Sequence, residues 1–155
     1  MGRVRKTSKA RRGFTLIEIM AVVVIIGFLL AIVAVNVAGR IDVARATTAR
    51  TQIMNIETAL DFYRSDNGRY PTVDQGLDAL VHEPTIEPIP RMYPAGGYLK
   101  GNRVPLDPWG VPFQYEAPGR QNPNGVDVWT LGADGQPGGA DVNADIGNWT
   151  VDAGN

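Results

Sequence analysis

Three carboxylates lie in a glycine-rich stretch near the C-terminal end of the sequence. The stretch runs from Leu131 to Trp149 and contains Asp134, Asp141 and Asp145. Carboxylates that converge in one loop repel each other, and a segment with so little apolar content cannot order itself by burying surface. A hard cation would resolve both problems, because calcium takes about six to eight oxygen ligands in flexible geometry. The composition therefore indicates either a calcium loop or a solvated acidic loop without a metal.

The spacing of Asp141, Asn143 and Asp145 imitates the opening of an EF-hand loop. The imitation fails at the sixth position, where Ile146 replaces the glycine, and no helical pattern flanks the segment. A calcium site here would therefore be of another type.

A fourth acid, Glu18, directly precedes an apolar run. From Ile19 to Ala38, 20 residues carry no charge, and a helix of that length spans a hydrocarbon layer of about 30 Å. The run predicts a transmembrane helix. A carboxylate near the bilayer centre costs roughly 2.5–3.5 kcal/mol, so Glu18 lies at the headgroup level or has a cationic partner. A cleaved secretory signal is the rival interpretation, but its apolar region is usually only about 7–15 residues long.

Charge is distributed unevenly along the chain. Six basic residues and no acid precede Phe14, and the remaining nine basic and 16 acidic residues give a formal charge of −7. The positive-inside rule therefore places the N-terminus in the cytoplasm and the residues after Arg40 outside. An acidic body makes nucleic acid an improbable partner, so we expect none.

Catalytic residues are not suggested by the sequence. Cysteine is absent, which excludes disulfides, thiol catalysis and thiolate metal sites, and His82 is the only histidine. No nucleophile and base occur in a recognisable pattern, so we expect a protein that is not an enzyme.

A long helix must position these groups. Ile53, Ile56 and Leu60 recur at helical spacing, which predicts one helix from Phe14 to about Arg64. An Asn-Gly pair after Asp66 is suited to ending it.

Shorter elements follow in the second half of the chain. Thr72 and Gln75 form a capping-box pattern that predicts a helix to about His82. Strands are predicted over Val111–Glu116 and Val126–Leu131, with turns at Asp107–Gly110 and Asn122–Gly125. The fold class is therefore α+β, a long helix against a small antiparallel sheet.

The N-terminal residues carry a resemblance to a known family. A basic leader ending in glycine, then Phe-Thr-Leu-Ile-Glu and a long apolar helix, resembles the N-terminus of type IV pilins and type II secretion pseudopilins. The resemblance implies that a prepilin peptidase cuts after Gly13 and that the new N-terminal Phe14 is methylated. It also implies that Glu18 pairs with the α-amine of an adjacent subunit in a fibre, and an ion pair makes a buried carboxylate tolerable.

Segments of the body resemble the major pseudopilins of type II secretion, the general secretion pathway protein G family. They are residues 62–71, 75–80 and 107–110. This resemblance implies a type IV pilin-like fold and a calcium site in the acidic loop. The implied ligands are the side chains of Asp134, Asp141, Asn143 and Asp145 with the backbone carbonyls of Leu131 and Gln136.

The resemblance implies three segments and a structural role. Residues 1–13 are the leader, 14–38 the transmembrane and assembly helix, and 39–155 a periplasmic globular domain. The chain would be a single-pass inner-membrane protein that polymerises with its own copies and works with minor pseudopilins and an inner-membrane secretion platform. The resulting pseudopilus would drive folded proteins across the outer membrane. Two alternatives stay open: a type IV pilin or minor pseudopilin, and a membrane-anchored calcium-binding domain that does not polymerise.

Overall fold

The computed structural model describes residues 13–101 and 103–151, without the side chains of residues 32–39 and 151. The chain divides into two compact units, Met1–Arg40 and Ile41–Asn155. The predicted leader up to Arg12 and the last part of the predicted membrane span therefore lie outside the described residues or side chains.

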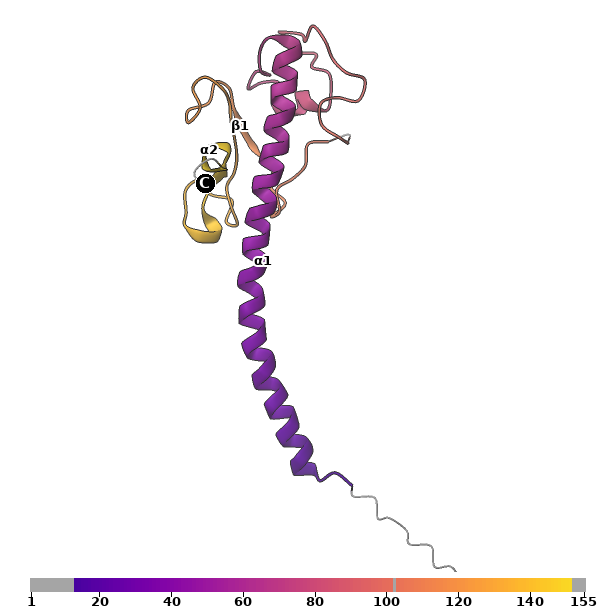
Figure 1. Cartoon of the computed structure of the whole chain (residues 1–155), viewed down its shortest axis with the longest axis vertical. Coiled ribbons are helices and arrows are strands. Elements are labelled where there is room, and N and C mark those ends of the chain that lie inside the picture. The colour runs from indigo at the N-terminus through magenta and orange to yellow at the C-terminus, as the bar shows by residue number, and fades with distance from the viewer. Residues whose placement is uncertain (1–12, 102, 152–155) are drawn as a thin grey trace, which may run out of the picture. The chain divides into compact units, whose positions relative to one another are not determined.

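One helix, α1, runs from Leu16 to Asn67 (Figure 1). It ends three residues later than predicted, because Asn67 stays helical and its side-chain amide donates to the carbonyl of Tyr63 at 3.0 Å. Gly68 then takes a positive φ of 74° and its N–H donates to the carbonyl of Arg64 at 2.7 Å. The predicted Asn-Gly stop is confirmed, since glycine adopts this left-handed conformation without steric cost.

The first unit exposes an apolar helix surface. Phe14, Leu16 and Phe28 are 80%, 80% and 71% exposed, and the apolar side chains between them are exposed as well. Within the described residues, no helix reaches the combined length and hydropathy of a membrane span.

The second unit contains a three-stranded antiparallel sheet. Its strands are β1 (Gln114–Glu116), β2 (Asp127–Thr130) and β3 (Ile146–Gly147), in the order β1-β2-β3. Both predicted strands exist but are shorter than predicted, and β3 was not predicted at all. Figure 1 shows β1 beside the later half of α1. The predicted α+β class, a long helix with a small antiparallel sheet, is confirmed.

The core forms where α1 meets the sheet and the connecting segments. Ile53, Ile56 and Leu60 of α1 have no exposed surface and belong to the same buried cluster as Val128 of β2 and Ile146 of β3. The 3.6-residue period of the helix and the alternation of the strand bring these side chains to one side. This packing holds the acidic loop, which begins after β2 and ends at β3.

The predicted helix from Thr72 to about His82 is wrong in type and length. The capping-box contacts exist, since Gln75 N–H donates to Thr72 Oγ1 at 3.2 Å and Thr72 N–H to Gln75 Oε1 at 3.0 Å. These contacts close only a turn. The next residue, Gly76, has a φ of 58°, and an α-helix cannot continue through a positive φ. Only a short 3₁₀ helix, η1, forms from Leu77 to Leu80.

Replacing Tyr63 with phenylalanine is expected to leave the fold as stable or make it about 1 kcal/mol more stable. Tyr63 is fully buried in the core, and among the described residues its hydroxyl has no hydrogen-bond partner. Removing a buried, unpaired polar group takes away a desolvation cost. Urea titration of both proteins measures the difference. A loss of more than about 1 kcal/mol would mean that the hydroxyl has a partner in solution.

Candidate functional site

The predicted processing and assembly residues lie together at the start of α1. Gly13, Phe14 and Thr15 precede the helix in non-helical backbone, and Phe14 is exposed. Thr15 and Glu18 form a capping box: Glu18 N–H lies 3.3 Å from Thr15 Oγ1, and Thr15 N–H lies 3.4 Å from Glu18 Oε2. Glu18 therefore has a local role as a helix cap, which the Thr-x-x-Glu pattern could have indicated.

The acidic loop folds back on itself between β2 and β3. Ala133 N–H donates to the carbonyl of Val142 at 3.1 Å, and Asp145 N–H donates to that of Gly138 at 3.2 Å. A Cβ on Gly132 would lie 2.8 Å from the carbonyl oxygen of Asn143, so only glycine permits this approach. A second 3₁₀ helix, η2, spans Asp141–Asn143 at the returning end of the loop.

The predicted metal ligands occupy different parts of this loop. Asp134 and Asp141 are exposed, and Asp134 Oδ1 accepts a hydrogen bond from Gln136 N–H at 3.0 Å. Asp145 Oδ2 accepts one from Gly138 N–H at 2.9 Å. Leu131 and Asn143 are half-buried near the ends of the loop. Among residues 13–101 and 103–151, no three acidic or histidine side chains form a group that could hold a metal.

The donor set nevertheless fits a hard cation. Asp145 Oδ1 is buried and no group in the described part of the chain bonds to it, which costs free energy unless another group does. The other predicted ligands are also oxygens, from carboxylates, an amide and backbone carbonyls, and calcium prefers this chemistry. A site in this loop would need backbone oxygens as well as carboxylates.

Asn148 anchors the returning end of the loop to the core. Its Nδ2 donates to Val126 O at 2.9 Å and to Glu57 Oε1 of α1 at 3.0 Å, and its Oδ1 accepts from Val128 N–H at 3.3 Å. The helix α2 (Asn148–Val151) starts at this residue. This role could not be predicted from the sequence, because the partners of Asn148 lie 20 or more residues away along the chain.

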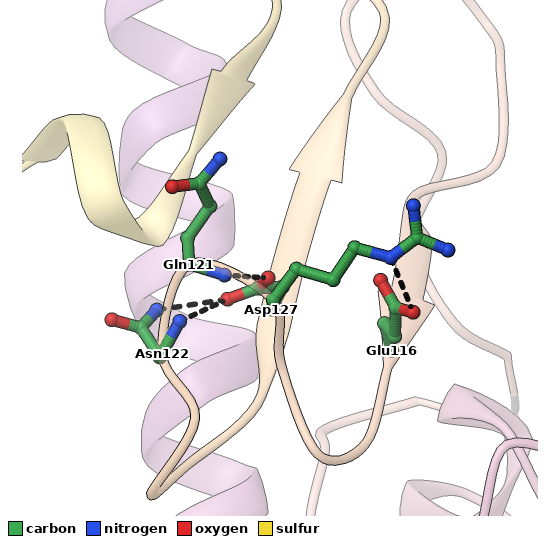
Figure 2. A network of polar contacts seen from close by, with 5 residues as sticks. Glu116, Gln121, Asn122 and Asp127 are labelled. Atoms are coloured by element: carbon green, nitrogen blue, oxygen red, sulfur yellow. Dashed lines mark hydrogen bonds and ion pairs between the residues drawn. The ribbon is translucent and has the colours of Figure 1, made fainter.

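Two buried carboxylates stabilise the turns around the sheet and were not predicted. Asp127 is 2% exposed, and it accepts hydrogen bonds from Gln121 N–H at 2.7 Å and from both Asn122 N–H and Asn122 Nδ2 at 3.0 Å (Figure 2). Asp107 accepts from Trp109 N–H, Val111 N–H and the Thr130 hydroxyl. These two acids therefore have a structural role in the turns and are not candidates for a metal site.

The stability of the second unit is expected to fall above about pH 10, the pKa of an unfolded tyrosine. Burial and a hydrogen bond to Asp66 raise the pKa of Tyr98 to about 12. The unfolded chain therefore loses this proton first, so the contribution of Tyr98 is complete below pH 10 and is lost as pH rises to about 12. Melting temperatures measured across this range test the slope, and Tyr98→Phe should reduce it. An unchanged slope in the variant would contradict the assignment.

Comparisons with known proteins agree with one another. Residues 36–149 match the family model described as type II secretion system (T2SS), protein G, and residues 8–34 match a prokaryotic N-terminal methylation motif. Type II secretion system core protein G of Pseudomonas aeruginosa is 52% identical, with 91% of this chain and 96% of that protein covered. The Vibrio cholerae protein of the same name is 51% identical, covering 94% and 97%. The crystal structure of the major pseudopilin from the type 2 secretion system of enterohaemorrhagic Escherichia coli matches with a TM-score of 0.62 and 43% identity, over 74% of this chain and 95% of that one.

Proposed function

The chain belongs to the type II secretion system protein G family, the major pseudopilins, and on this premise we propose that its copies polymerise into a pseudopilus that drives folded proteins across the outer membrane. The observation that carries the proposal is the match along nearly the whole length of proteins named core protein G. The relatives bear the name of a secretion-system component, which favours a structural role over catalysis.

Processing is proposed to occur between Gly13 and Phe14. A prepilin peptidase would cut this bond and the new α-amine of Phe14 would be methylated, in keeping with the matched N-terminal methylation motif. The bond is placed suitably, because it lies in non-helical backbone ahead of α1, where a protease can bind an extended chain.

Assembly is proposed to bury the apolar surface of the first unit. Exposed side chains from Phe14 to Leu30 would lie in the inner membrane before assembly and against neighbouring copies afterwards. The N-terminus would face the cytoplasm, as the basic leader favours, and the second unit the periplasm. Minor pseudopilins and an inner-membrane secretion platform would be the other partners.

The acidic loop is proposed to bind calcium. Asp145 would contribute its unpaired Oδ1, together with Asp134, Asp141, Asn143 and the backbone carbonyls of Leu131 and Gln136. The bound ion would hold the exposed residues of the loop against the end of β2 and neutralise their repulsion.

Removing calcium is expected to lower the stability of the protein. At a calcium concentration about 100 times the dissociation constant, binding contributes roughly 2.7 kcal/mol. Thermal unfolding with calcium and with a chelator measures the difference, and Asp145→Asn should remove most of it. Asp74→Asn is the matched control, because Asp74 is an exposed acid outside the loop. A melting temperature that is the same with and without the chelator would contradict calcium binding, but it would not bear on the proposed polymerisation.

A further inference from the structure

The sequence contains two Asn-Gly pairs, Asn67-Gly68 and Asn124-Gly125. In such a pair the backbone nitrogen of glycine can attack the side-chain carbonyl carbon of asparagine, because glycine has no side chain that hinders the approach. A C–N bond forms, ammonia leaves, and water opens the resulting succinimide to aspartate or isoaspartate. Water is the only other reactant, so the local structure decides which pair reacts.

Asn67 is fixed by its surroundings. Its side chain donates to Tyr63 O at 3.0 Å and to the Tyr98 hydroxyl at 3.2 Å, and it accepts from Met92 N–H at 3.1 Å. The residue is only 4% exposed, and the attacking nitrogen, that of Gly68, is itself bonded to Arg64 O at 2.7 Å. All of these bonds must break before the ring can close.

Asn124 is free by comparison. It is exposed in the turn Asn122–Gly125, and the side-chain hydrogen bonds of this turn among the described residues involve Asn122 and Asp127 but not Asn124. Two backbone bonds hold Gly125 among the described residues: its N–H donates to Asn122 O at 2.9 Å, and its carbonyl accepts from Gly119 N–H at 3.1 Å. Only the first of these bonds engages the attacking nitrogen, and a turn bond at the surface opens locally at low free-energy cost.

We propose that Asn124 is a site of spontaneous deamidation in the folded protein, whereas Asn67 is protected. The product carboxylate would lie in a pocket of about 380 Å³ that Asn124 lines together with Arg64 and Arg69. No carboxylate lines this pocket among the described residues, so the positive charges of Arg64 and Arg69 would attract the new carboxylate. The Arg69 guanidinium also donates to Pro88 O at 2.6 Å and to Ile89 O at 3.0 Å. The modification would make the surface of an ageing subunit more acidic by one charge.

The test is incubation of the purified full-length chain in detergent at mildly alkaline pH, followed by peptide mass analysis. The peptide with Asn124 should deamidate more than about tenfold faster than the peptide with Asn67, because several hydrogen bonds protect the latter. In a denaturant, both peptides should react at similar rates. Gly125→Ala is the control: its φ is not positive and the added Cβ would lie 3.8 Å from its nearest neighbour, so the variant should fold and react more slowly. Equal rates for the two pairs in the folded protein, or a faster reaction at Asn67, would overturn the proposal.

Discussion

Replacing Glu18 with glutamine is expected to abolish fibre assembly while leaving the chain in the membrane. Glutamine at this position of a capping box can still accept the bond from Thr15 N–H, so the start of α1 is retained. What the variant loses is the negative charge that we propose to pair with the α-amine of Phe14 in a neighbouring copy. Electron microscopy of sheared fibres and membrane fractionation measure the two outcomes separately.

Thr15→Ala is the matched control for this prediction. It removes the Thr15 hydroxyl that Glu18 N–H contacts at 3.3 Å, at a cost of about 0.5–2 kcal/mol of helix stability, and it leaves the carboxylate in place. Fibres should therefore persist in Thr15→Ala. Fibres in Glu18→Gln and none in Thr15→Ala would assign Glu18 to helix capping and contradict a role in charge pairing.

Replacing Asp127 with alanine is expected to destabilise the second unit by about 3 kcal/mol or more, the largest effect on folding that we predict, because each amide that loses its acceptor costs about 1–3 kcal/mol. The change leaves the amides of Gln121 and Asn122 without their carboxylate acceptor near the core. The turn before β2 would then have to rearrange or expose its backbone to water. Denaturant titration of the purified chain measures the loss.

Glu116 provides the comparison, since it lies opposite Asp127 on β1 (Figure 2). Its side chain is 30% exposed and bonds at 2.9 Å to Arg120, whose own side chain is 84% exposed. An exposed pair of this kind contributes about 0–1 kcal/mol, so Glu116→Gln should change little. Equal losses of folding free energy in the two variants would contradict the prediction that the buried position of Asp127 makes its hydrogen bonds more stabilising than the exposed pair of Glu116.

Local rules explain which parts of the fold the sequence predicts correctly. The long helix follows from its 3.6-residue period, and its end follows from the preference of glycine for positive φ at Gly68. The turn at Asp107 follows from its Asp-Pro-x-Gly pattern, and Gly110 N–H indeed donates to Asp107 O at 3.0 Å. Each of these features is decided by residues within a few positions of one another.

Features that depend on distant residues were missed. β3 has only two residues and exists because Ile146 pairs with Thr130, 16 residues earlier. Asp107 and Asp127 look like surface acids in the sequence, yet both are buried, because backbone amides and the Thr130 hydroxyl satisfy them. The amides that bond Asp127 lie only five and six residues before it, but no turn pattern in the sequence indicates these bonds. The turn pattern at Asp107 could have indicated bonds to the amides that follow it.

The sequence predicts the N-terminal part of the candidate site better than the acidic loop, again because local patterns are easier to interpret than contacts between separated residues. Gly13, Phe14 and Glu18 form a contiguous string, so the sequence places them at one end of α1 without any tertiary information. The acidic loop was predicted over residues 131–149, but its last part forms β3 and the start of α2. The internal bonds of the loop depend on glycines that approach Asn143 closely. Composition cannot specify which oxygens such a fold directs inward.

Mass analysis of the N-terminus of subunits taken from isolated fibres tests the polymer role most directly. We predict fibres composed of this chain, with every subunit beginning at a methylated Phe14. A chain that begins at Met1 and stays unassembled in the membrane, under conditions in which the secretion system works, would contradict a pseudopilus subunit.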